Sequence, residues 1–239
     1  MAHAPENTIA ALRHAHENGA KACEIDIRLT ADGQLILMHD ATLDRTTNGE
    51  GAVRVHNVDQ VLSLDAGGWF HSAFAGERVP LLSETIEVAR QLGLILRVEL
   101  KDWHDNTTLF TSLARLLENR VDPPVVFCSF DHRQLLDLKQ ALPMVRTMGI
   151  YHGRGVNMLE MARSAQLDGL SVQVPALTDS DIETLHAAGL CLSCYLPMNE
   201  PVFENGANLE KLRGWWRQGL VDMVTVNDVA WLHHAMKHH

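Results

Sequence analysis

Two pairs of charged residues have the spacing that places side chains on one face of a β-strand. Glu24 and Asp26 are two apart in an apolar run. Glu99 and Lys101 repeat that spacing in a second run. Because successive side chains of a strand point to opposite faces, each pair projects from one side of its strand. Buried charges are costly unless they are paired or bound to a metal, so we expect the two pairs to converge.

Carboxylate oxygens at the place where the two pairs converge would suit a hard divalent cation. Glu24, Asp26 and Glu99 provide three carboxylates, with no Cys or His of ligand spacing among them to favour zinc. We therefore expect these three residues to ligate a divalent cation, Mg²⁺ or Ca²⁺. The same residues, together with Lys101, also allow a buried salt-bridge cluster without a metal, and the spacing alone leaves both interpretations open.

His39 is the candidate for proton transfer. It follows the short apolar run 34–38, which we expect to pair back on the preceding strand, and Asp40 comes directly after it. The unperturbed pKa of histidine, about 6.5, allows exchange of protons near neutral pH. The chain contains 14 histidines, so the position of His39 is equally compatible with an ordinary surface residue.

The elements that must hold these residues alternate along the chain. Short Val-, Ile- and Leu-rich runs predict strands, and segments of helical periodicity separate them. The predicted strands are 22–29, 94–100, 125–130, 145–150, 169–174, 190–196 and 223–226, and the predicted helices are 5–20, 82–92, 107–118, 132–141, 158–166, 179–188, 209–218 and one from Val229. This alternation predicts a parallel sheet covered by helices, and the count favours a TIM (β/α)8 barrel. The helix at 5–20 has no strand ahead of it, so we expect the first strand of the barrel to be missing from this chain.

Domain organisation follows from the same pattern. We expect one barrel domain over residues 1–239, since there is no internal repeat and no interdomain linker. The segment at about 41–80 is polar and breaks the alternation, which indicates a small insertion at the mouth of the barrel.

Composition narrows the classes of partner. With 46% hydrophobic and 21% charged residues, the chain of 239 residues has ordinary globular composition, and its net charge of −10 argues against nucleic-acid binding. We expect no membrane span, because no apolar stretch approaches about 18 residues. The four cysteines lie in apolar runs and fit a reducing compartment, which favours a cytoplasmic location. The sequence does not decide the oligomeric state.

At this point the motifs resemble those of the glycerophosphodiester phosphodiesterase family, in order and spacing over essentially the whole chain. The matching runs are Ala4-Pro5-Glu6-Asn7-Thr8, Glu24-Ile25-Asp26, His39-Asp40, Thr42-Leu43-Asp44-Arg45-Thr46-Thr47-Asn48-Gly49, Arg78-Val79-Pro80, Val98-Glu99-Leu100-Lys101 and Ser129-Phe130-Asp131. The resemblance implies a (β/α)8 barrel that hydrolyses a small-molecule glycerophosphodiester to sn-glycerol 3-phosphate and an alcohol.

The resemblance also implies roles for individual residues. Glu24, Asp26 and Glu99 would ligate the cation, His39 would be one of two acid/base histidines, and Lys101 would steady the phosphate. On the alcohol side of the pocket, Phe130 and Tyr195 are candidates for substrate contact, although core packing is the commoner role of such aromatics. Glu6, Asn7 and Thr8 either start a helix or contact the substrate.

One departure from the family pattern leaves alternatives open. The family has a His-Arg-Gly at the end of its first strand, ahead of Ala-Pro-Glu-Asn-Thr, and the sequence begins too late to contain it. The alternative is therefore a truncated or catalytically inactive relative that binds a metal and a phosphorylated ligand. A lysophospholipid-type phosphodiesterase is less favoured, because it predicts an apolar loop at the barrel mouth and the segment 41–80 is polar with scattered aromatics.

Overall fold

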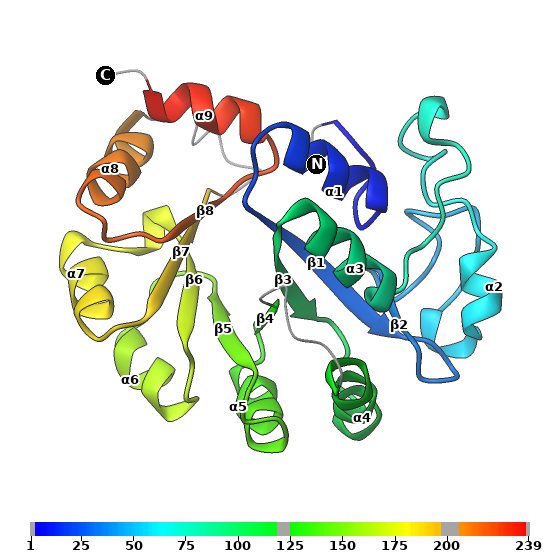
Figure 1. The fold of residues 1–239 in the computed structure, drawn as a ribbon. Helices are drawn as coiled ribbons and strands as arrows, with labels where there is room; N and C mark the ends of the chain where they lie inside the picture. The colour runs from blue at the N-terminus through cyan, green and yellow to red at the C-terminus, as the bar shows by residue number, and fades with distance from the viewer. Residues whose placement is uncertain (1–2, 119–124, 197–205, 238–239) are drawn as a thin grey trace. The chain divides into compact units, whose positions relative to one another are not determined.

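The computed structural model describes residues 3–118, 125–196 and 206–237 (Figure 1). The chain divides into two compact units. The first comprises residues 1–127 with 228–230, and the second comprises residues 128–227 with 231–239. Strands and helices alternate in both units, as the sequence predicts.

The strands of the first unit are centred on β1 (Ala22–Leu29). It pairs antiparallel with β2 (Leu35–Leu37) and parallel with β3 (Ile95–Leu100). The buried Ile25 and Ile27 occupy one face of β1, while the charged residues of β1 occupy the other. The strand therefore separates an apolar side from a side that can carry chemistry.

Helices α1 (Ile9–Glu17), α3 (Leu82–Leu92) and α4 (Asn106–Leu117) belong to the same unit, and α1 packs beside α3 (Figure 1). The predicted helix at 5–20 is shorter than expected at both ends. It begins after Thr8, whose Oγ1 accepts a hydrogen bond from the Ala11 N–H as an N-cap. It ends before Gly19, whose φ of 89° does not continue a helix. Among residues 3–8, the described part of the chain ahead of α1, there is no strand.

The predicted insertion forms a packed structure with its own small core. It contains the 3₁₀ helices η1 (Val53–Val55) and η2 (Ser72–Phe74) and the helix α2 (Val58–Leu62). The core of the insertion also includes one residue of β2 and the residue that follows β2. Its buried apolar side chains are Ile36, Met38, Leu43, Val53, Val61, Ala66 and Val79. Because this core includes Ile36 of β2 and the following Met38, the insertion fixes the segment that precedes His39.

The second unit contains a parallel row of strands with helices between them. The row runs β5 (Arg146–Tyr151), β6 (Gly169–Gln173), β7 (Cys191–Tyr195) and β8 (Met223–Thr225). Its helices are α5 (His132–Ala141), α6 (Met158–Ser164), α7 (Asp179–Ala187) and α8 (Gly206–Arg217), and it also contains the 3₁₀ helix η3 (Val174–Ala176). Strand β4 (Val125–Ser129) and helix α9 (Val229–Lys237) each contribute residues to both units. Apart from η3, which the sequence did not predict, these elements lie within a few residues of the predicted bounds.

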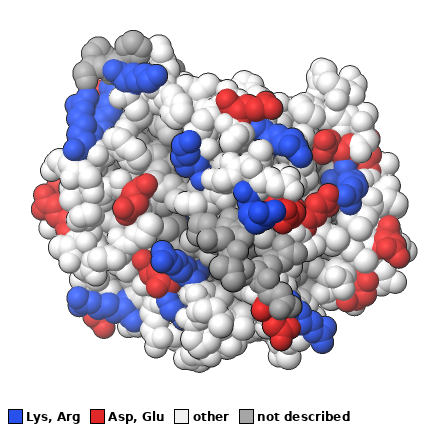
Figure 2. Space-filling model, viewed as in Figure 1, with Lys and Arg blue, Asp and Glu red and all other residues white. Residues whose placement is uncertain are grey.

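The surface of the described residues is mixed in charge. On the face drawn in Figure 2, Asp and Glu side chains lie among Lys and Arg side chains. None of the helices in the described part of the chain combines the length and apolarity that a bilayer span requires. None of the four cysteines forms a disulfide within the described part of the chain. In the C-x-x-C of β7, Cys191 is exposed and Cys194 is buried, so the two residues lie in different environments.

Candidate functional site

The three predicted carboxylates converge in the first unit. In the register of β1 and β3, Glu24 lies opposite Arg97 and Asp26 lies opposite Glu99. One ligand oxygen from each of Glu24, Asp26 and Glu99 can be chosen so that all lie within 4.8 Å of one another. Calcium–oxygen bonds measure about 2.3–2.6 Å, so one ion can reach all three oxygens. The chemistry and the spacing of this trio therefore fit a hard divalent cation.

Lys101 lies between two members of this acidic trio. Its Nζ is 3.1 Å from Asp26 Oδ1 and 2.6 Å from Glu99 Oε1. Asp26 and Glu99 are each only 6% exposed, so both ion pairs are shielded from water. The salt-bridge cluster that the sequence allows is thus present, and it coexists with a constellation of oxygens that fits a metal.

Burial and charge act together on the ionisation of these groups. Desolvation, followed by the neighbouring Asp26 carboxylate, raises the pKa of Glu24, and Arg97 opposes this shift. Desolvation also raises the pKa of Glu99, against the effect of the Lys101 ammonium. Burial alone would lower the pKa of Lys101, but Asp26 and Glu99 outweigh it and raise that pKa. Negative charge is crowded here, and a bound cation would relieve the crowding.

Two arginines on the same strand faces were not singled out from the sequence. Arg97 is 3% exposed and acts electrostatically on Glu24. Arg28 donates to the His39 carbonyl oxygen at 2.8 and 3.0 Å and to Asp102 Oδ1 at 3.0 Å. The sequence could have identified Arg28 by its two-residue spacing, because Arg28 follows Glu24 and Asp26 on the same face of the strand. Arg28 thereby ties the end of β1 to the segment that carries His39.

His39 lies at the end of β2, close to the acidic trio. Met38, the residue before it, donates its N–H to the Asp26 carbonyl oxygen at 3.0 Å. The side chain of His39 is half exposed, and its charge contributes to the ionisation of Glu99. Its Nδ1 lies 2.7 Å from Asp40 Oδ1. This contact occupies Nδ1 and leaves Nε2 as the nitrogen that can exchange protons with a substrate.

Asp40 is in turn held by Arg45. Arg45 Nε and Nη2 donate to Asp40 at 2.6 and 3.1 Å, and Nη1 and Nη2 donate to the two carboxylate oxygens of Glu6 at 2.8 and 2.6 Å. The hydrogen bond from Arg45, opposed by partial desolvation and assisted by His39, lowers the pKa of Asp40 to about 2. Asp40 is therefore ionised at neutral pH, when a carboxylate is only an acceptor, so the proton in its contact with His39 lies on Nδ1.

The lowered pKa of Asp40 predicts how the free energy of unfolding depends on pH. Because the pKa of Asp40 falls on folding, its contribution is complete above the unfolded value of about 3.9 and is lost as the pH falls toward 2. We expect Asp40→Asn to lower the free energy of unfolding by about 1–2 kcal/mol at pH 6, after allowance for solvent screening, and by much less at pH 2.5. Urea unfolding at both pH values measures the difference. An exposed control, Asp59→Asn, is expected to show no such trend, and a pH-independent loss in Asp40→Asn would contradict the assignment.

Phe130 and Tyr195 belong to the second unit. Phe130 follows β4 and is 46% exposed, and Tyr195 ends β7, where its hydroxyl donates to the Tyr151 carbonyl oxygen at 3.2 Å. Tyr195 is thus engaged within its own unit. Contact of either aromatic with a substrate stays a prediction.

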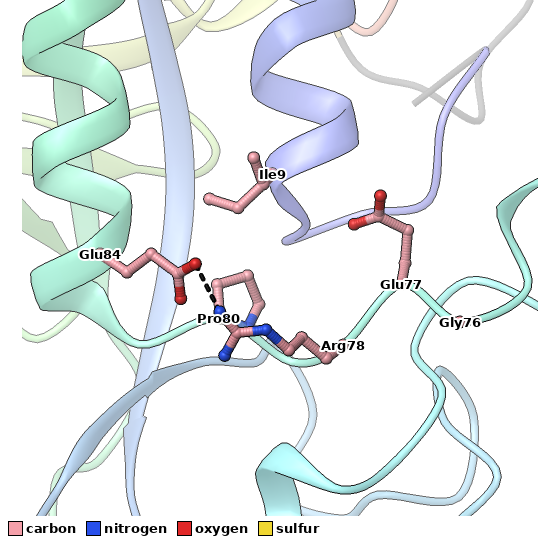
Figure 3. A pocket seen from close by; sticks show the side chains of 6 residues that line it. All are labelled: Ile9, Gly76, Glu77, Arg78, Pro80 and Glu84. Carbon is pink, nitrogen blue, oxygen red and sulfur yellow. Dashed lines mark hydrogen bonds and ion pairs between the residues drawn. The ribbon is translucent and has the colours of Figure 1, made fainter.

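A separate hollow of about 220 Å³ lies where α1, the insertion and the start of α3 approach one another (Figure 3). Its lining residues are Ile9, Gly76, Glu77, Arg78, Pro80 and Glu84. Arg78 Nη2 is held by Glu84 Oε1 at 2.6 Å, and none of the lining residues is among those predicted to act on a substrate. The converging charges of β1 and β3, rather than this hollow, therefore mark the candidate site.

A known protein family matches nearly the whole chain. The Glycerophosphoryl diester phosphodiesterase family matches residues 1–231. A glycerophosphodiester phosphodiesterase of Caldanaerobacter subterraneus is 38% identical over 152 residues, which are 62% of this chain and 61% of that relative. The chain thus spans about three fifths of that relative's length. A glycerophosphodiester phosphodiesterase of Bacillus subtilis is 28% identical over 234 residues, with 90% of this chain and 78% of the relative covered.

A solved structure shows the same fold. The phosphodiesterase of Oleispira antarctica, determined in complex with the product sn-glycerol-3-phosphate, superposes with a TM-score of 0.86 at 26% identity. The match covers 99% of this chain and 93% of the other. The predicted α/β barrel class is thereby confirmed.

Proposed function

Since this chain belongs to the glycerophosphoryl diester phosphodiesterase family, we propose that it hydrolyses glycerophosphodiesters to sn-glycerol 3-phosphate and an alcohol with the help of a divalent cation. The observation that carries the proposal is the convergence of Glu24, Asp26 and Glu99 around Lys101. The relative crystallised with sn-glycerol-3-phosphate supports the choice of product.

The acidic trio would hold the cation, and Lys101 would contact the reacting phosphate. Glu24, Asp26 and Glu99 would hold Mg²⁺ or Ca²⁺, which when bound supplies a positive charge that polarises the phosphoryl oxygens. Lys101 is held by Asp26 and Glu99, so its ammonium group would need no further ordering to meet a phosphate oxygen. With the cation bound, the site would offer positive charge to the negative charge of a phosphodiester.

His39 would move the proton. Its Nδ1 proton is committed to Asp40, and Nε2 can accept a proton from the attacking oxygen or return one to the departing alcohol oxygen. Arg28 holds the main-chain carbonyl of His39, and Arg45 holds Asp40, so both ends of the residue are restrained. Hydrolysis breaks the bond between phosphorus and the alcohol oxygen, and water supplies the new oxygen and the two protons of the products.

Release of glycerol 3-phosphate from glycerophosphocholine and glycerophosphoethanolamine tests this function. We expect metal-dependent release that EDTA abolishes and that added Mg²⁺ or Ca²⁺ restores. Lysophosphatidylcholine, assayed in parallel, tests the lipid alternative. A folded protein that binds the metal but releases nothing from any of these substrates would overturn the proposal and favour a non-catalytic metal-binding relative.

A further inference from the structure

The turn before α1 contains a backbone conformation that side-chain-bearing residues rarely adopt. Asn7 has φ of 55°, in the left-handed region, and apart from Gln166 it is the one non-glycine residue with positive φ in the described ranges. Asparagine tolerates this region better than most residues, but the conformation persists only where the surroundings hold it. The contacts of Asn7 and of the residues on either side of it show what holds the turn.

Both polar atoms of the Asn7 side chain are used on one residue of the acidic trio. Nδ2 donates to Asp26 Oδ2 at 2.9 Å, and Oδ1 accepts from the Asp26 main-chain N–H at 2.9 Å. This two-point contact fixes Asp26 both at the backbone and at the carboxylate. With Oδ2 occupied by Asn7, Oδ1 is the oxygen that faces Lys101, at 3.1 Å.

The turn itself is anchored without the Asn7 side chain. Thr8 Oγ1 donates to the Pro5 carbonyl oxygen at 2.8 Å and also caps α1 by accepting from Ala11 N–H. Glu6 is tied to Arg45 by two hydrogen bonds. Starting the helix is therefore the work of Thr8, and the side chain of Asn7 is available for another role.

We propose that Asn7 is a positioning residue that orients the Asp26 carboxylate for the divalent cation. The inference rests on the proposed function in so far as that function requires the cation. It refines the interpretation of the Glu6–Thr8 run, which the sequence assigned to a helix start or to substrate contact. Residues that orient metal ligands typically change metal affinity or activity by about 10- to 100-fold when they are replaced.

Asn7→Gly separates positioning from folding. Glycine adopts positive φ without strain, so it removes both hydrogen bonds to Asp26 while favouring the same turn. The matched control is Asn18→Gly at the other end of α1, where Asn18 donates to the His14 carbonyl oxygen. Mn²⁺ alone is titrated into each protein and followed by electron paramagnetic resonance, and the melting temperature of each metal-free protein is recorded.

We expect Asn7→Gly to weaken Mn²⁺ binding at least about tenfold while the metal-free protein still folds, with a melting temperature lowered modestly by the two lost hydrogen bonds. We expect Asn18→Gly to bind Mn²⁺ as the unchanged chain does. The metal concentration for half-maximal hydrolysis should rise by the same factor, with the rate recovered at saturating metal. Equal affinity in Asn7→Gly, an equal loss in Asn18→Gly, or no Mn²⁺ binding by the unchanged chain would overturn the inference. If only the proposed function fails, no protein will hydrolyse the substrate, but Asn7→Gly will still bind Mn²⁺ more weakly than the unchanged chain and Asn18→Gly.

Discussion

Glu24→Gln is expected to abolish metal-dependent hydrolysis while leaving the metal-free protein at least as stable as before. The substitution replaces one of three carboxylate ligands with a neutral amide, which weakens the hold on the cation and so the stabilisation of charge on the phosphate by several kcal/mol. We therefore expect a loss of about 10³-fold or more in kcat/KM. Stability is expected to hold because the negative charge of Glu24 lies beside those of Asp26 and Glu99. Its removal relieves repulsion between like charges.

Calorimetric metal titration, kinetics and thermal unfolding measure these effects on the same preparation. Glu87→Gln is the matched control, since it makes the same change of charge on α3, where Glu87 pairs with Arg90. It should leave metal affinity and rate unchanged. Full activity in Glu24→Gln would show that the acidic trio is a structural cluster rather than a metal site.

His39→Gln is expected to reduce kcat by about 10²- to 10⁴-fold, the usual contribution of a positioned acid or base. Glutamine retains the polarity of the side chain and its capacity for hydrogen bonding to Asp40, but it cannot exchange protons near neutral pH. The metal affinity of His39→Gln should stay within a factor of about two of that of the unchanged chain, because the proposed metal ligands are Glu24, Asp26 and Glu99 and do not include His39.

Glu24→Gln and His39→Gln are expected to differ in their effect on metal affinity, and this difference tests the separate roles of the two residues. Glu24→Gln should lose metal affinity and rate together, whereas His39→Gln should lose rate alone. His16→Gln, on the exposed side of α1, is the control for the loss of a histidine and should behave as the unchanged chain. An unaltered kcat in His39→Gln would show that His39 does not take part in the proton transfer and is an ordinary surface histidine.

The sequence by itself determined the fold class and the core of the site. Both follow from local periodicities, because a strand alternates its side chains regardless of what surrounds it. The two-residue spacing of Glu24 with Asp26, and of Glu99 with Lys101, therefore sufficed to predict their convergence once a parallel sheet was expected. Helix and strand bounds were close for the same reason, and the first helix was overestimated because the Thr8 cap competes with its periodic pattern.

Tertiary structure alone decided which residues support that core. Arg45 meets Glu6 across 39 positions of sequence, and Asn7 meets Asp26 across 19. These contacts depend on how the insertion packs against β2 and on the positive φ of Asn7, and neither property has a local sequence signature. The position of Arg97 opposite Glu24 depends on strand register, which pairing between distant segments fixes. Periodic patterns are local, whereas side-chain hydrogen bonds require two backbones to be placed within a fraction of an ångström, and only the folded chain does that.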